Sequence, residues 1–541
     1  MSNSGPLLFL PVLTPLAAGL LLPWLRLTGA GKRIYTAGTA LINAGLILLL
    51  IWGRPGSEGV LFWLAEDLPV FLRLDPLAAI YLALTAVFWV GLTFFSHGYI
   101  AADERETRYY AFFLGLAGVL AGLGLAGNIV TFYLFFEWLT FMAFPLICHN
   151  GDSEAINGGM TFLIYSVLGA GMVLVGLVLL WGEGPIAAFA PGGAWAGQIP
   201  SAGGGRTTAA LLLLLFGFGC KAGMYPLHAW LPVAHPVAPA PVSAVLSALL
   251  TKAGALGMIR VLYYLAGPAY WRAAWARYLW LTVILATIFL GSMLAFREPL
   301  LKKRLAYSSV SQIAYLLFGL ALLEPAGFAG AILQLIFHGL AKLILFLCVG
   351  VLIRQAGCRE VGELKGVGRR MPAVMGCFAL AALSLAGVPP LGGFISKWYL
   401  IKGALAADIG IFSWLGPVVL LISALLTAGY LLPPVISAFF PGAGVGGTRE
   451  SFDVAGVTGV GEASGVAETG GAGGDAGVAG AGEAGEGTAV AGAGGQRATP
   501  ASDWRLTAPL VVLTALSLLL ALSPGWLLDY LAALSAALLG D

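Results

Sequence analysis

Six ionisable side chains lie in stretches of sequence that are otherwise apolar enough to cross a membrane. An ionised group in bilayer hydrocarbon costs about 3 kcal/mol, so each one requires a partner or a water-filled cavity. Burial favours the neutral form of an amine, whereas a nearby carboxylate favours its charged form. Because four lysines share one carboxylate, they cannot all be permanently paired, and the set predicts a proton relay. The six residues are Glu137, Lys221, Lys252, His338, Lys342 and Lys397.

Histidines accompany the lysines. His338 and Lys342 are four residues apart, so they share one face of a helix, and a water between them could pass a proton. His228 and His235 follow Lys221 and are expected near the cytoplasmic surface, as candidate groups for proton uptake. The plain alternative for each histidine is a packing or surface role. For the carboxylate and the first lysine, the alternative is a static ion pair that locks two helices together.

Helix-breaking residues lie beside two of the lysines. Pro226 follows Lys221 by five residues, and Lys397 is preceded by the run PPLGG at 389–393. Such breaks free backbone carbonyl and amide groups, which a membrane tolerates only within protein or along a cavity. The pattern therefore predicts two discontinuous helices with water-accessible lysines. The plain alternative is an ordinary proline kink.

The composition is that of a membrane protein. Of the 541 residues, 59% are hydrophobic and 10% are charged, too few charges for a soluble protein of this size. A net charge of +2 gives no reason to expect nucleic acid as a partner. The five cysteines lie far apart without a C-x-x-C pair, so neither a disulfide framework nor a metal or iron–sulfur site is expected. The tract GAGEAG at 480–485 follows no strand, and we expect no dinucleotide or other cofactor.

Fourteen apolar segments are long enough to span a bilayer, which predicts an all-α polytopic membrane protein. The first segment lacks a preceding positive charge and a cleavage site, so it is expected to be retained. Residues 60–75 alternate too quickly for a spanning helix and are expected to form an extracytoplasmic hairpin or loop. The segments begin near residues 6, 34, 76, 109, 129, 159, 209, 239, 276, 306, 326, 372, 411 and 505.

The loops indicate the orientation in the membrane. Most of the 28 Lys and Arg residues fall on the side that holds REPLLKKR at 297–304 and RQAGCREVGELKGVGRR at 354–370. By the positive-inside rule this side is cytoplasmic, and both termini of this cell-membrane protein are expected on the outside.

The segments divide into units. Residues 109–264 and 276–440 hold five helices each, and because five is odd, the second unit must enter the membrane from the opposite side, as an inverted repeat. Lys221 and Lys397 fall on the fourth helix of their units, predicted helices 7 and 12. Residues 1–108 hold three helices and the hairpin, 441–502 a disordered Gly/Ala-rich cytoplasmic insertion, and 503–541 the last helix and a tail.

Three stretches resemble a known family. They are KAGMYPLHAWLPVAHPVAPAPVSAVLSALLTKAG from Lys221, FHGLAKLILF from Phe337 and LSLAGVPPLGGFISKW from Leu383. Together they resemble the antiporter-like proton-translocating subunits shared by respiratory complex I, membrane-bound hydrogenases and multisubunit Mrp sodium/proton antiporters. The resemblance implies that Glu137 and Lys221 form a gating pair and that Lys397 passes the proton to the outside. It also implies that Lys252, His338 and Lys342 relay the proton between them.

The length and the lysine at 397 are most similar to the D subunit of Mrp antiporters, which implies monovalent cation/proton antiport. A proton-pumping subunit of a complex I-like NADH:quinone oxidoreductase or of a membrane-bound hydrogenase is the alternative. Either reading implies other membrane subunits as partners, protons and possibly sodium as the ions moved, and no redox cofactor in this chain. A stand-alone solute transporter would instead have a roomy site at the midplane with few chained ionisable groups.

Overall fold

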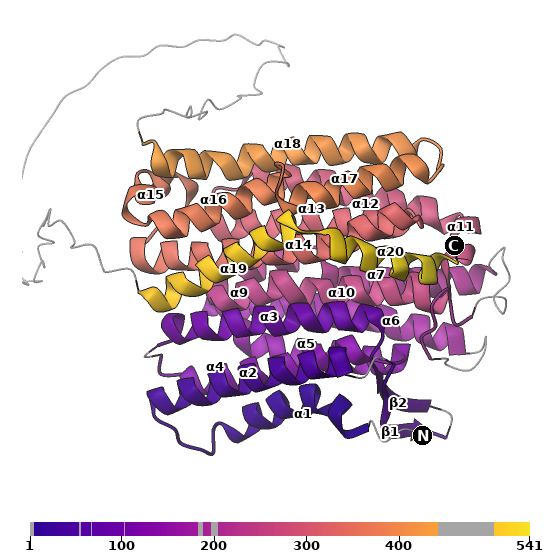
Figure 1. Cartoon of the computed structure of the whole chain (residues 1–541), viewed down its shortest axis with the longest axis horizontal. Helices are drawn as coiled ribbons and strands as arrows, with labels where there is room; N and C mark the ends of the chain where they lie inside the picture. The colour runs from indigo at the N-terminus through magenta and orange to yellow at the C-terminus, as the bar shows by residue number, and fades with distance from the viewer. Residues whose placement is uncertain are drawn as a thin grey trace, which may run out of the picture. The chain divides into compact units, whose positions relative to one another are not determined.

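The computed structural model describes residues 5–53, 56–66, 68–101, 103–181, 188–195, 204–441 and 503–540. Within them the chain forms long helices that lie side by side, together with one two-stranded hairpin (Figure 1). The predicted all-α polytopic fold is confirmed. The predicted insertion, apart from its first residue, Pro441, lies outside the described residues, as does the GAGEAG tract.

The chain begins with two helices, a hairpin and a third helix. The hairpin forms where alternation predicted it, and its strands pair antiparallel from Glu58 opposite Arg73 to Ala65 opposite Leu68. Strand β2 is largely buried, whereas β1 is largely exposed. We call the end of the bundle that carries these strands the hairpin end. The elements are α1 (Gly5–Leu21), α2 (Gly29–Gly53), β1 (Glu58–Ala65), β2 (Leu68–Arg73) and α3 (Pro76–Tyr99).

The next helices contain the first predicted break. The helix that carries Lys221 ends at Gly223, whose φ of 84° suits glycine, and helical structure resumes at Trp230. The predicted eighth helix is continuous but holds two π-helical segments, η1 (Leu246–Leu250) and η2 (Arg260–Leu265). The other elements are α4 (Glu106–Leu125), α5 (Ile129–Ile147), α6 (Ser153–Trp181), α7 (Gly205–Ala222), α8 (Trp230–Val237), α9 (Ala240–Val245) and α10 (Thr251–Ile259).

The following helices contain the second break. Gly387, at a φ of 90°, ends one half-helix, and the second half begins at Gly392. The opposite end of the bundle carries the arginine- and lysine-rich stretches 297–304 and 354–370, and we call it the basic end. The elements are α11 (Pro268–Ala273), α12 (Ala276–Arg297), α13 (Leu301–Ala321), α14 (Pro325–Val351), η3 (Leu352–Ala356), η4 (Val361–Leu364), α15 (Val367–Arg370), α16 (Pro372–Ala386), α17 (Gly392–Ala406) and α18 (Phe412–Phe439).

Two helices close the described chain, α19 (Trp504–Leu522) and α20 (Gly525–Leu539). The segment after the last predicted span was expected to be a tail, and this expectation is wrong. Pro524 forms the N-cap of α20, so the apolar residues that follow continue as a helix after a bend at Ser523.

All fourteen predicted segments begin in or beside a helix. Among the described residues, ten helices are long and apolar enough to cross a membrane, and α1, α16 and α20 are shorter apolar helices. Helix α16 falls short because the second break divides its span. Helix α7 is long enough but carries Arg206 and Lys221, and α13 begins with three basic residues.

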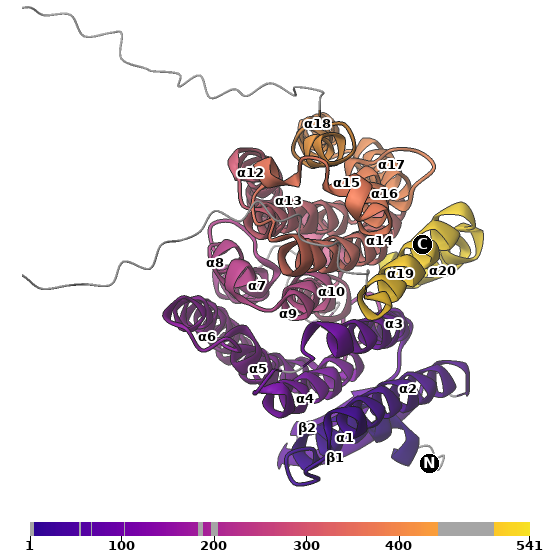
Figure 2. The same cartoon turned by 90° about the vertical axis from the view of Figure 1, so that its left-hand side faces the viewer.

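Burial separates central helices from peripheral ones (Figure 2). Every residue from Ala240 to Leu265 is buried, and so is 94% of the most apolar eighteen-residue stretch between Pro325 and Ala356. In the most apolar eighteen-residue stretches of α2 and α19, by contrast, only 33% of the residues are buried, and the exposed leucines and tryptophans of these helices suit contact with lipid. Lys252, His338 and Lys342 therefore lie on the two central runs.

Candidate functional site

Lys221 is the next-to-last residue of α7 and is only 1% exposed. Its Nζ donates hydrogen bonds to the carbonyl oxygen of Phe136 and to Oγ1 of Thr140, both at 2.7 Å. It also lies 3.9 Å from the centre of the Phe136 ring, a cation–π contact. The ammonium is therefore held by α5, on the turn that carries Glu137.

Glu137 interacts electrostatically with Lys221, but the two residues form no ion pair among the described contacts. One of its carboxylate oxygens is buried without a hydrogen-bond partner in the part of the chain that is described. The structure thus places the first carboxylate and the first lysine on facing helices, close to one another but not bound.

Lys252 follows the π-helical segment η1. Its Nζ donates a hydrogen bond of 2.6 Å to the carbonyl oxygen of Ser247, which also accepts one of 2.8 Å from Oγ1 of Thr251. The hydroxyl of Ser247 lies 2.8 Å from that of Ser309 in α13. π-Helical turns occur frequently at functional sites. Here one turn presents a carbonyl oxygen to a buried lysine.

Lys342 is fixed by the same region of α13. Its Nζ donates to the carbonyl oxygen of Leu305 at 2.7 Å and to Oγ of Ser308. Adjacent serines of α13, Ser308 and Ser309, therefore contact Lys342 directly and Lys252 through Ser247. Two lysines 90 positions apart in the sequence are thus brought to one place.

His338 lies one turn before Lys342 on α14, as its spacing predicted, and its side chain is buried. Neither ring nitrogen has a hydrogen-bond partner among the described residues. The ring interacts electrostatically with Lys252, Lys342 and Lys397. His338 therefore lies between the lysines of the two halves.

Lys397 lies in α17, just after the second break. Its Nζ donates a hydrogen bond of 2.5 Å to the carbonyl oxygen of Leu385, in the last turn of α16. A Cβ at Gly387 would lie 3.1 Å from this Nζ, so glycine leaves room for the ammonium. The break provides the acceptor. Lys397 follows its break, however, whereas Lys221 precedes its own, so the two lysines are not in equivalent places.

His235 is fully buried, so its predicted place near a surface is wrong. It lies in α8, which packs between α6 and α13, and its ring stacks on Phe346 with 4.6 Å between the centres. Both of its nitrogens lack partners within the described residues. Lys302 donates a hydrogen bond of 2.6 Å to the carbonyl oxygen of Ala238 and interacts electrostatically with His235. His228 lies in the first break and is half-buried.

A buried polar network in the second half was missed by the sequence reasoning. The amide nitrogen of Gln334 donates a hydrogen bond of 2.9 Å to Oε1 of Gln312. The Oε1 of Gln334 accepts one of 2.6 Å from the hydroxyl of Ser396, the neighbour of Lys397. Gln334 precedes His338 by four residues. The periodicity that selected His338 and Lys342 would therefore have found it, had neutral amides been considered.

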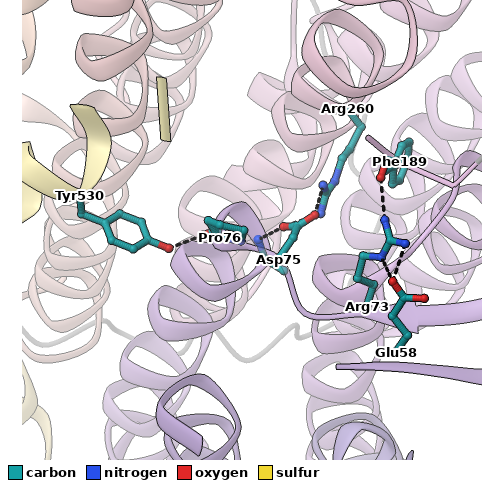
Figure 3. A network of polar contacts seen from close by, with 8 residues as sticks. Glu58, Arg73, Asp75, Pro76, Phe189, Arg260 and Tyr530 are labelled. Carbon is teal, nitrogen blue, oxygen red and sulfur yellow. Dashed lines mark hydrogen bonds and ion pairs between the residues drawn. The ribbon is translucent and has the colours of Figure 1, made fainter. Parts of the chain in front are cut away.

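A second polar cluster lies at the hairpin end (Figure 3). Asp75 caps α3 by accepting a hydrogen bond of 2.8 Å from the backbone N–H of Ala78. Both of its carboxylate oxygens also pair with the guanidinium of Arg260. Arg260 is buried and stacks over the ring of Tyr264, 4.5 Å from its centre. The hydroxyl of Tyr530 in α20 donates a hydrogen bond of 3.0 Å to the carbonyl oxygen of Pro76. These contacts join α3, η2 and α20.

We expect Arg260→Met to destabilise the protein by about 3–5 kcal/mol, because it leaves the Asp75 carboxylate without its buried partner. The exposed pair of Arg73 with Glu58, drawn in the same figure, provides the matched control. Arg73→Met should cost less than about 1 kcal/mol. Thermal melting of the detergent-purified protein measures both variants, and equal melting temperatures would contradict this role for Arg260.

A polar pair closes the loop between α5 and α6. Nε2 of His149 lies 3.2 Å from Oδ2 of Asp103. Burial lowers the pKa of His149, although the carboxylate opposes the shift. Burial alone would raise the pKa of Asp103, but the backbone N–H of Arg105 and the interaction with His149 hold this pKa below its ordinary value. Among the described contacts the pair bonds to none of the six predicted residues, and we assign it to fixing the loop.

The comparisons with known proteins agree with one another. The pattern of the family described as NADH:quinone oxidoreductase/Mrp antiporter, transmembrane, matches residues 126–426. The N subunit of the NADH-quinone oxidoreductase of Desulforudis audaxviator is 31% identical over 466 residues, covering 82% of this chain and 87% of the relative. The D subunit of the Na⁺/H⁺ antiporter of Bacillus subtilis is 29% identical over 448 residues, covering 80% and 86%.

Solved structures show the same fold. A chain of the Mrp complex from Dietzia superposes with a TM-score of 0.75 at 24% identity, over 98% of this chain and 97% of that one. A chain of respiratory complex I from Thermus thermophilus gives a TM-score of 0.74 at 22% identity, over 98% and 99%.

Proposed function

The chain belongs to the family of membrane subunits shared by NADH:quinone oxidoreductases and Mrp antiporters, and on this premise we propose that it carries protons across the membrane within a larger complex. The family pattern covers all six predicted residues. The partners are other membrane subunits of that complex, and the redox chemistry of any such assembly belongs to them, because this sequence carries no cofactor motif.

One observation carries the proposal, the unpartnered ring of His338 among three lysines. A buried polar group without a hydrogen bond costs about 1–3 kcal/mol, so this ring requires a partner that the described residues do not supply. Water is the partner that buried polar groups accept most readily. A hydrated imidazole can accept a proton on one nitrogen and release it from the other, which a packed histidine cannot do.

We assign successive roles to the buried groups. Glu137 and Lys221 gate the first half, where the carboxylate controls the charge of a lysine that it faces but does not bind. Lys252, bound to the carbonyl oxygen of Ser247, and Lys342, bound to Ser308, exchange the proton with His338. Lys397, bound to a carbonyl that the second break exposes, releases it.

Protons are taken up from the basic end, which we propose is cytoplasmic, with both termini outside. His235 and Lys302 support this route because they lie between that end and Lys342 and interact with one another. His228, in the first break, serves the first half. The five-helix units 109–264 and 276–440 then act as two inverted half-channels that meet at His338.

The proposed assembly is an Mrp-type antiporter, in which proton movement is coupled to a monovalent cation. The specific alternative is a complex I-like or hydrogenase pump, which the similarity to the N subunit favours equally. Purifying the complex from native membranes and identifying its components separates the two. Co-purifying flavin or iron–sulfur subunits support the pump, whereas only membrane subunits and sodium-dependent proton release support the antiporter.

We expect His338→Phe to lower proton-coupled transport roughly tenfold in everted vesicles, because the ring shape is kept and the exchangeable nitrogens are lost. The loss is smaller than the hundredfold or more typical of a transferring side chain, because water near Lys342 retains part of the path. Trp398→Phe, an exposed residue of α17, should transport normally. Unchanged transport in His338→Phe would remove the imidazole from the path.

A further inference from the structure

A long apolar groove runs along the periphery of the bundle between α2, α3 and α19. The part toward the basic end has a volume of about 700 Å³, and its walls are almost entirely hydrocarbon. Small side chains on the facing helices, among them Ala83, Gly91 and Ala508, keep it open. None of the proposed relay residues lines it, so it has no part in the proton path described above.

Two arginines stand at the basic end of this groove, Arg33 from α2 and Arg505 from α19. Both interact electrostatically with the buried His97 of α3, which places the two charges around the same point. Neither guanidinium has a carboxylate partner among the described residues. Glu106 pairs with Lys32 at 3.2 Å, and Asp503 caps α19 with a hydrogen bond of 3.1 Å from the backbone N–H of Arg505, so neither carboxylate forms a described ion pair with the two arginines.

Two like charges that converge without an acidic partner repel one another, and an anion between them relieves the repulsion. The groove behind them accepts only apolar groups. Trp504, 70% exposed beside Arg505, is of the kind found where protein meets the headgroup region of a bilayer. The required ligand is therefore long, apolar and anionic at one end.

We propose that this groove binds a phospholipid with a negatively charged headgroup, whose phosphate lies between Arg33 and Arg505 and whose acyl chains lie along α3 and α19. Basic pockets between membrane helices recognise anionic lipids in this way. An apolar helix of a partner subunit would fill the groove but would leave the two charges without a counterion.

The other end of the groove provides an internal contrast. A cavity of about 820 Å³ continues between α2, α3, α19 and α20 toward the hairpin end, sharing Ala83, Val87 and Leu516 with the first. Its charged residues already have partners: Arg73 binds Glu58, and Asp75 binds Arg260. This end offers no free positive charge within the described residues, so the preference for an anionic lipid is confined to the basic end.

The test is native mass spectrometry of the purified complex, titrated with phosphatidylglycerol or with phosphatidylcholine. The complex should bind phosphatidylglycerol about thirtyfold more tightly, since each of the two arginines near the headgroup contributes about 1 kcal/mol and about 1.4 kcal/mol is a factor of ten. The double variant Arg33→Gln/Arg505→Gln should lose this preference. The double variant Arg369→Gln/Arg370→Gln, which removes two exposed charges from α15 at the same end, should keep it. Val512→Trp, which fills the groove from an exposed position, should weaken binding of both lipids.

Equal binding of the two lipids by the unaltered complex would overturn the proposal, and this comparison requires no variant to assemble. A preference that survives loss of both arginines would overturn it as well. A photo-crosslinking amino acid introduced in place of Val512 should capture lipid. Capture of a partner polypeptide would assign the groove to a subunit interface instead.

Discussion

Replacing Lys221 by alanine is expected to lower proton-coupled transport at least about hundredfold, to the level of vesicles without the protein. Among the described hydrogen bonds, the Lys221 ammonium is the only charged group bound by the turn around Phe136 and Thr140. Its removal therefore leaves no bound ammonium at the gate of the first half. Transport is measured in everted vesicles as the collapse of an imposed proton gradient, with the amount of assembled complex determined in the same membranes.

Arg206→Gln is the matched control, because Arg206 is an exposed basic residue in the first turn of the same helix. Glu137→Ala should give the same loss as Lys221→Ala, and the exposed Glu154→Gln should not. Normal transport in either gate variant, at normal assembly, would remove that residue from the path. A variant that transports normally but melts earlier would assign the pair a purely structural role.

Lys397→Ala is expected to have an equally large effect, by blocking release from the second half. Its ammonium binds the carbonyl that the break at Gly387 leaves free, and no other lysine approaches that carbonyl among the described contacts. Lys402, exposed five residues later on the same helix, provides the control: Lys402→Ala should transport normally.

The double variant Lys221→Ala/Lys397→Ala separates a series path from independent channels. Residues that act in one path have effects that do not multiply, so the double variant should transport no less than either single variant. If Lys397→Ala abolished transport and Lys221→Ala left it normal, the protein would contain a single half-channel and no relay.

Much of this arrangement could be predicted from the sequence. An ionisable residue in an apolar segment stands out against its neighbours, and all five basic residues of the six are buried in the structure. The two helix breaks could also be predicted, because proline and glycine act on the local backbone. Both features depend only on a residue and its neighbours in the sequence, so the sequence alone predicts them.

The partners of these residues could not be predicted, because they depend on packing between distant segments. Nothing near Lys252 indicates that Ser247 would contact Ser309, 62 residues away. The π-helical turns depend on packing rather than on composition. His235 was misplaced because its sequence resembles a loop after a span, whereas α8 folds between α6 and α13. The ion pair of Asp75 with Arg260 could not be predicted either, because each residue lies at the end of an apolar segment, where charged residues are common.

A high-resolution electron cryo-microscopy map of the assembled complex, sharp enough to resolve ordered water, tests the relay most directly. The account predicts water within hydrogen-bonding distance of both His338 nitrogens, continuing to the ammonium groups of Lys342 and Lys397 on one side and toward Lys252 and Lys221 on the other. Apolar side chains packed against both ring nitrogens, with no water between the lysines, would contradict it.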